Sequence, residues 1–217
     1  INYHQSPDKQ EDMTEKIDTY CKALNSLAEQ YDSPVIRYNK YLVWTYRHEI
    51  LMEYEKMLVV ISDAQEYING YPEYYQSKQI THLYLKKLTA YLHLQDGKGL
   101  LEIPALLDAY TKGNKNWYTF QAYHFLLAMH TQNYERASEV YNEVVGFSKF
   151  SKADSEIHDK WEIFNYYLNY AIDYLYQGFR DLKQEQIKVF KVKKFLAQKP
   201  LFPKHQRIYI VHLATVQ

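Results

Sequence analysis

A short stretch in the middle of the chain, Asn133-Tyr134-Glu135-Arg136-Ala137 with Tyr141 four residues later, constrains the fold more than any other feature. Apolar residues recur on both sides of it at three- and four-residue steps, which is the spacing of amphipathic helices. The stretch therefore predicts a turn between two helices, the second beginning near Tyr134. Looser versions of the pattern occur at three other places: Glu53, Asp96 and Gly178.

Composition supports long helices. The 217 residues include only 6 Gly and 6 Pro, so many tight hairpin turns are not expected. Hydrophobic residues make up 47% and charged residues 24%, as in a folded protein. The best strand candidate, Leu58-Val59-Val60-Ile61, lies inside a pattern that also fits a helix. We therefore expect an all-α fold.

Start and stop signals divide the chain into about nine or ten helices. Ser6-Pro7 and Ser33-Pro34 are typical helix starts, and Asn69-Gly70 is expected to end a helix in the left-handed conformation. We expect one helical-repeat domain over 1–217, part of a longer chain. Its expected elements are an N-terminal helix over 7–31, helical pairs near 34–70, 73–112, 115–146 and 152–198, and an unpaired final helix over 203–216.

The N-terminal helix is expected to turn Met13, Ile17, Tyr20, Leu24 and Leu27 inward. In the central stretch, Tyr134, Ala137 and Tyr141 are expected to pack between helices. Glu135 and Arg136 are expected to face water.

This central stretch resembles the core of a tetratricopeptide repeat, in which an aromatic residue follows a short turn, a small residue comes three later and another aromatic four after that. The resemblance implies a right-handed α-α superhelix of antiparallel helix pairs whose first helices line a concave, peptide-binding face. The four turns lie 43, 37 and 45 residues apart (53 to 96, 96 to 133, 133 to 178), whereas the family's period is 34. Thr45 and Phe125 stand where the family has Gly or Ala. Other helical-hairpin solenoids are the alternative.

No catalytic motif is recognisable: the chain has no Gly-rich phosphate loop, nucleophile elbow or zinc-protease helix. His158 and Glu162 share a helix face, as metal ligands can, but a pair that supports its helix is the preferred interpretation. We expect no catalytic, cofactor-binding or metal-binding residue. The single cysteine, Cys21, excludes an intrachain disulfide and favours a reducing compartment.

Charge is balanced overall, with a net charge of 0, so nucleic acid is not an expected partner. The ends differ: residues 1–33 hold seven acids and three lysines, and residues 180–207 hold nine basic residues and two acids. A solvated rim is the preferred interpretation of the basic segment, with attraction between the ends of two molecules as an alternative. Without an apolar run of 18 residues or a signal peptide, we expect no membrane span and a cytoplasmic protein; a removed leader stays open.

The 24 tyrosines suggest a function, because tyrosine suits a surface that is partly apolar and partly hydrated. We expect a non-enzymatic module that binds a protein or peptide of unknown identity in a tyrosine-rich groove. The alternatives are the ligand-sensing half of a regulator whose output domain lies elsewhere, and an all-α enzyme with a buried site. The candidate groove residues are Tyr38, Tyr41, Arg47, Tyr84, Lys87, Tyr91, Tyr118, Tyr123, Tyr167 and Tyr170.

Overall fold

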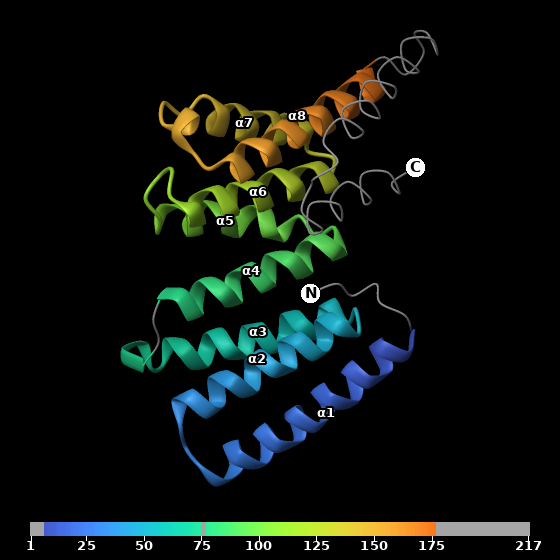
Figure 1. The fold of residues 1–217 in the computed structure, drawn as a ribbon. Coiled ribbons are helices and arrows are strands. Elements are labelled where there is room, and N and C mark those ends of the chain that lie inside the picture. The colour runs from blue at the N-terminus through green and yellow to red at the C-terminus, as the bar shows by residue number, and fades with distance from the viewer. Residues whose placement is uncertain (1–6, 75–76, 177–217) are drawn as a thin grey trace. The chain divides into compact units, whose positions relative to one another are not determined.

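The structure, a computed structural model, describes residues 7–74 and 77–176 (Figure 1). These residues contain helices but no strand, so the all-α prediction is confirmed for them, and the candidate strand at 58–61 lies inside a helix. The α-helices are α1 (Pro7–Gln30), α2 (Pro34–Ile50), α3 (Tyr54–Asn69), α4 (Ser77–Leu94), α5 (Lys98–Asp108), α6 (Lys115–His130), α7 (Tyr134–Val145) and α8 (Ser155–Tyr176). Two short 3-10 helices, η1 (Pro72–Tyr74) and η2 (Phe150–Lys152), lie in the connections.

Most helix boundaries lie close to those expected from the sequence. The expected helices over 180–198 and 203–216 lie outside the described residues. One helix end differs from the expectation: Gly70 has φ −75° and ψ −14°, so α3 does not end in the left-handed conformation. Instead the backbone tightens, and the N–H groups of Gly70 and Tyr71 bond to carbonyls three residues back, at 3.1 and 3.0 Å.

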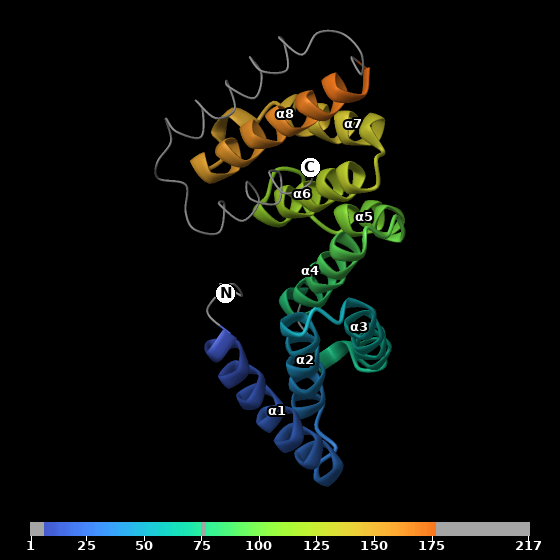
Figure 2. The ribbon, with the colours of Figure 1, turned by 90° about the vertical axis from the view of Figure 1, so that its right-hand side faces the viewer.

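The chain divides into two compact units, unit 1 (residues 1–104) and unit 2 (residues 105–217). In unit 1, α2 packs against α1 and α3, and α3 packs against α4 (Figure 2). Helix α3 buries one face at three- and four-residue steps, as the 3.6-residue period requires. Its core residues and those they contact on α2 and α4 are Tyr38, Met57, Ile61, Ala64, Ile68, Leu83 and Ala90.

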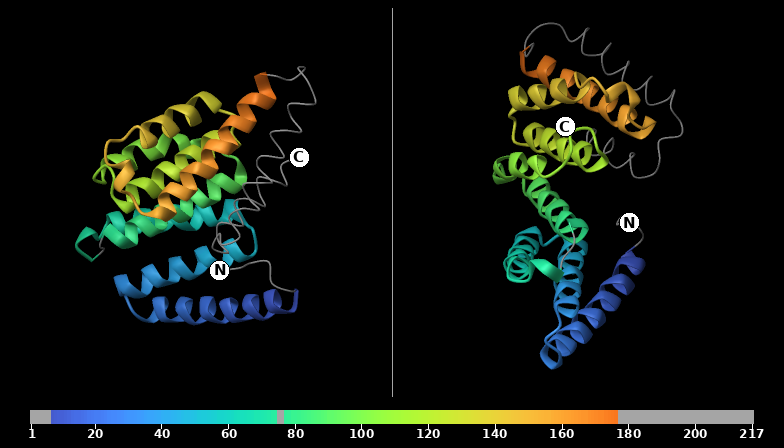
Figure 3. Two further views of the ribbon diagram at one scale, coloured as in Figure 1. Left: turned by 45° about the horizontal axis from the view of Figure 1, so that its top comes forward. Right: turned by 90° about the vertical axis from the view of Figure 1, so that its left-hand side faces the viewer.

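In unit 2, α7 packs against both α6 and α8 (Figure 3). Helix α6 is buried on nearly every side, so its apolar residues do not form a single stripe. Its Phe125 is stacked on Phe164 of α8, with ring centroids 4.5 Å apart. Ala137 of α7 is fully buried, and its small side chain permits close packing of the helices, as expected.

The turns after α2, α4 and α6 share one backbone geometry. In each, a residue other than glycine has a positive φ: Met52 (56°), Gln95 (53°) and Gln132 (59°). The N–H of the next residue then bonds to the carbonyl five residues earlier, which is the closing bond of a Schellman motif. These bonds are Glu53 to His48 (2.8 Å), Asp96 to Tyr91 (2.9 Å) and Asn133 to Ala128 (2.8 Å). Three of the four places marked by the sequence pattern thus have the same joint.

Because side chains disfavour positive φ, glycine at such a joint is expected to stabilise the fold. We predict that Gln132→Gly raises the free energy of unfolding by about 0.5–1 kcal/mol, measured by urea titration. As a control, Glu162→Gly, in the right-handed interior of α8, should lower it by a similar amount. A loss of stability in Gln132→Gly would show that the joint does not strain the backbone.

Candidate functional site

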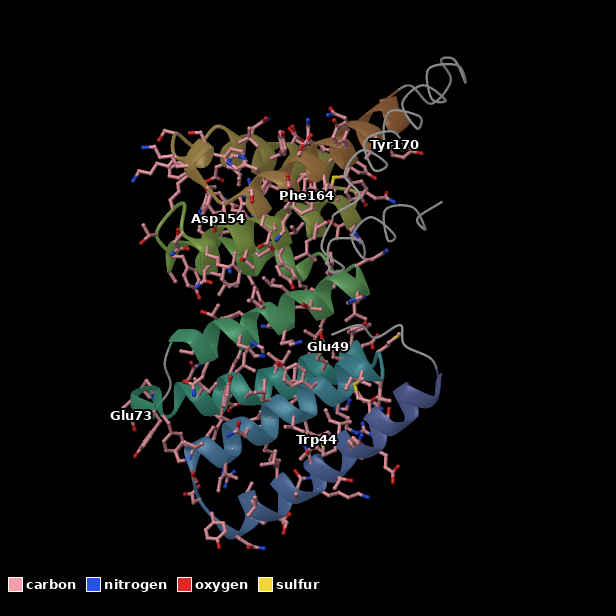
Figure 4. All side chains as sticks on the ribbon, viewed as in Figure 1. Trp44, Glu49, Glu73, Asp154, Phe164 and Tyr170 are labelled. Carbon is pink, nitrogen blue, oxygen red and sulfur yellow. The ribbon has the colours of Figure 1, made fainter. Side chains whose placement is uncertain are left out.

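Four polar side chains meet between α2 and α4 in unit 1, and we call them the α2–α4 cluster: Tyr46, Glu49, His82 and Lys86. The hydroxyl of Tyr46 lies 3.0 Å from Nε2 of His82. Lys86 Nζ donates a hydrogen bond to Glu49 Oε2 at 2.5 Å. The same ammonium lies 4.5 Å from the centroid of the Tyr46 ring, within range of a cation–π interaction. Figure 4 labels Glu49 where α2 approaches α4.

Helix geometry explains why these four residues meet. Tyr46 and Glu49 are three residues apart, and His82 and Lys86 are four apart, so each pair lies on one face of its helix. Helices α2 and α4 also contact each other directly, although α3 separates them in sequence. The pairs therefore face each other across the helix contact. Lys86 and Glu49 form an ionic link, and Tyr46 and His82 form a neutral hydrogen bond.

Burial sets the charge state of the cluster. The side chains of Lys86 and Glu49 are only 16% and 11% exposed, so their attraction is little screened by solvent. Burial, aided by the positive charge of Lys86, lowers the pKa of His82. Burial, aided by the negative charge of Glu49, raises the pKa of Tyr46. At neutral pH the cluster therefore combines a neutral imidazole and a protonated phenol with the Lys86–Glu49 ion pair.

A second polar network joins the first three helices and accounts for Arg47. Arg47 Nε donates to Asp18 of α1 at 2.5 Å, and its NH1 lies 3.5 Å from Glu53. Glu53 also contacts Nδ1 of His48 at 2.8 Å and Nζ of Lys56 at 2.5 Å. The hydrogen bond from Lys56, followed by that from His48, lowers the pKa of Glu53. Arg47, a candidate groove residue, thus connects α1, α2 and α3.

Three of the candidate groove tyrosines are buried: Tyr38, Tyr91 and Tyr118. Tyr38 belongs to the core of unit 1. The Tyr91 hydroxyl donates to Glu102 of α5 at 2.9 Å, and burial together with that carboxylate raises its pKa to about 12. Lys87 pairs with the same carboxylate at 2.9 Å, so these two candidates link α4 to α5.

The other candidates are more accessible. Tyr41, Tyr84, Tyr123 and Tyr167 are half-buried, and Tyr170 is exposed. Tyr38, Tyr41, Arg47, Tyr84, Lys87 and Tyr91 belong to unit 1, and Tyr118, Tyr123, Tyr167 and Tyr170 to unit 2. None of the four cluster residues was among the ten candidates. The one signal that points to them is polar residues at helical spacing on the first helices of successive pairs.

Unit 2 contains a buried polar centre that the sequence did not reveal. Arg136 Nε donates to Nε2 of His124 at 3.1 Å, and His124 is only 2% exposed. Burial, then the charge of Arg136, lowers the pKa of His124 to about 4. The expectation that Arg136 faces water holds in part: its side chain is 40% exposed, but its Nε reaches from α7 to His124 of α6. Nδ1 of His124 and Oε1 of Gln121 have no hydrogen-bond partner among the described residues.

Comparisons with protein-family models, with curated proteins and with solved structures found no match to this chain. Among the described helices, none is long and apolar enough to cross a membrane. Within 7–74 and 77–176, no group of three or more His, Cys, Asp or Glu side chains is arranged to hold a metal ion.

Proposed function

We propose that the chain is a tetratricopeptide-like interaction module in which antiparallel helix pairs form a right-handed superhelix. The shared geometry of the joints at Met52, Gln95 and Gln132 supports this proposal, because a common joint gives successive pairs a common crossing geometry. The direct packing of α2 on α3 and of α6 on α7 also supports it.

The proposed ligand is a peptide segment, and its proposed site in unit 1 is the α2–α4 cluster. The observation that carries this proposal is the half-buried link between Tyr46 and His82 beside the Lys86–Glu49 pair. Such groups offer donors and acceptors to a peptide backbone while the aromatic rings supply apolar contact. In unit 2, Tyr123, Tyr167 and Tyr170 remain the proposed contacts.

Selection of binders from a random peptide library displayed on phage tests the proposal. We predict that the full chain enriches peptides with a common motif. Lys86→Ala and His82→Ala should each lower the affinity for the selected peptide about tenfold, because each removes a hydrogen-bonding or charged contact. Tyr123→Ala and Tyr167→Ala test the unit 2 contacts in the same assay.

Val59→Ala, an exposed position on α3, is the control and should leave affinity unchanged. Circular dichroism should show unchanged helicity in every variant. Equal affinity of the cluster variants and the original chain would exclude the α2–α4 cluster as the site. Failure to enrich any motif would contradict peptide binding itself.

A further inference from the structure

An aromatic surface lies at one end of unit 1, where the first half of α2 packs against the end of α3. Four tyrosine rings follow one another across it, and we call them the tyrosine ladder: Tyr41, Tyr67, Tyr71 and Tyr74. The centroid distances between successive rings are 6.1, 4.9 and 6.3 Å. The first two rings are half-buried, whereas Tyr71 and Tyr74 are 37% and 56% exposed. The last two rings of the ladder are therefore accessible to a partner.

The ladder already holds one guanidinium group. Cζ of Arg37 on α2 lies 5.6 Å from the centroid of the Tyr67 ring, within range of a cation–π interaction. Nε of Arg37 also lies 3.6 Å from Oδ1 of Asp32. A planar guanidinium suits this place because it can stack on a ring while its N–H groups reach a carboxylate. A ring with a carboxylate beside it thus holds an arginine on this surface.

Three further carboxylates surround the ladder. Asp63 and Glu66 on α3 and Glu73 in η1 are all exposed, and Figure 4 labels Glu73. Burial, then the negative charge of Asp63, raises the pKa of Tyr41; Glu66 adds to this rise, and Arg37 opposes it. Among the described residues, none of the three acids forms an ion pair. These carboxylates therefore remain available to a cationic partner.

The lysine beside the ladder in the sequence does not neutralise these acids. Lys40 directly precedes Tyr41, and successive residues of an α-helix point about 100° apart. Lys40 is also not among the charges that shift the pKa of Tyr41. The surface therefore has a surplus of negative charge, which repels the phosphates of a nucleic acid and attracts a basic peptide.

We propose that the tyrosine ladder binds an arginine-bearing peptide segment of a partner protein. Guanidinium groups of the partner stack on Tyr71 and Tyr74 and pair with the carboxylate of Glu73. This arrangement repeats the one by which the ladder holds Arg37. The exposed acids of α3 attract the same peptide by charge. The ladder shares no residue with the α2–α4 cluster, so this second surface goes beyond the proposed peptide binding.

Fluorescence anisotropy of the full chain with a labelled arginine–glycine repeat peptide tests the proposal. We expect saturable binding that weakens about tenfold when citrulline, a neutral isostere of arginine, replaces every arginine. A lysine–glycine peptide should also bind more weakly, because an ammonium group lacks the planar face of a guanidinium. Raising the salt from about 0.1 M to about 1 M should weaken binding, since the Debye length falls from ~10 Å to ~3 Å.

Removal of the exposed rings tests the stacking contact. Tyr71→Ala/Tyr74→Ala should lower the affinity for the arginine peptide about tenfold, with unchanged helicity by circular dichroism. The control comes from α1, where Tyr20 and Leu27 were expected to face inward. They are 64% and 40% exposed instead, because α2 packs on the neighbouring side of α1. Tyr20→Ala therefore removes an exposed ring outside the ladder and should leave the affinity unchanged.

Charge reversal tests the ionic contact. Glu73→Lys should lower the affinity for the arginine peptide about tenfold, because it replaces an attraction beside the two exposed rings by a repulsion. Glu15→Lys makes the same change of net charge at an exposed position in the first half of α1 and is the matched control. It should leave the affinity nearly unchanged.

Three results would overturn the proposal: no binding of the arginine peptide, equal losses for the ladder variants and their controls, or tighter binding of a labelled oligothymidine, which would show that the rings stack on nucleic-acid bases. Lys86→Ala should leave the affinity for the arginine peptide unchanged. A tenfold loss in that variant would place the peptide at the α2–α4 cluster and would also contradict the ladder. The two sites are tested with different peptides and different variants, so either proposal can fail alone.

Discussion

Phe125→Ala is expected to lower the free energy of unfolding of unit 2 by about 3–5 kcal/mol. Phe125 is fully buried, stacks on Phe164 at a centroid distance of 4.5 Å and meets the edge of Trp161 at 6.0 Å. Removing the ring loses both contacts and leaves a cavity among large, rigid neighbours. Since a whole domain is typically stable by only ~5–15 kcal/mol, this single change removes a large fraction of the total.

Urea titration followed by near-ultraviolet circular dichroism measures this loss, because Trp161 packs against the altered site. Tyr170→Ala is the matched control in the same helix as Phe164; its side chain is exposed, so the change should stay within about 0.5 kcal/mol. Phe125→Leu should be intermediate, since leucine fills part of the cavity. Equal losses for Phe125→Ala and Tyr170→Ala would refute the stacked core.

Acid is expected to destabilise unit 2 through His124. Its pKa falls from 6.5 to about 4 on folding, so the unfolded chain binds a proton more readily than the folded one. The stability that depends on neutral His124 is therefore fully present above pH ~6.5. It decreases as the pH falls and is lost near pH ~4. A pKa difference of this size corresponds to about 3 kcal/mol. Protonation also removes the acceptor for Arg136 and places two cations together, which the nearby Glu139 and Glu143 offset in part.

Comparison of two histidine variants across this pH range separates His124 from the carboxylates, which also titrate in acid. His124→Gln keeps an acceptor for Arg136 but takes up no proton, so the loss between pH ~6.5 and ~4 should shrink by about 3 kcal/mol. His158→Gln, on α8 against Phe150, should leave the loss as it is. The same acid profile in His124→Gln and the original chain would disprove the role of His124.

Helix positions could be predicted from the sequence because they depend on local spacing. The spacing of apolar residues, Ser-Pro starts and Gly breaks all act within a few residues, and the described helices follow them. The expectation for Gly70 was wrong because glycine permits a left-handed helix end without requiring one. The next residues tighten into η1 instead.

The partners of long polar side chains could not be predicted in the same way. Tyr46 and His82 are 36 residues apart, and Glu49 and Lys86 are 37 apart, so their contact depends on how α2 meets α4. Arg136 has a water-facing position on its own helix, yet its side chain spans the gap to His124. Tyr91 is of a residue type that is common in binding sites, but its hydroxyl donates a hydrogen bond to Glu102 of α5. Residue type alone does not reveal these contacts, because they depend on how the helices pack.

The joints at Met52 and Gln132 bear on where the chain tolerates added residues. The backbone N–H groups of Glu53 and Asn133 close the preceding helix by bonding to a carbonyl five residues earlier. Each of these residues is also the N-cap of the next helix. One inserted residue there would break both functions, whereas the connections after α3, α5 and α7 carry no such double role. Insertions and deletions during evolution should therefore accumulate in those connections, and the same places suit epitope tags or fluorescent labels. A joint of constant length between spacers of variable length also explains why the turns of this chain recur at unequal intervals.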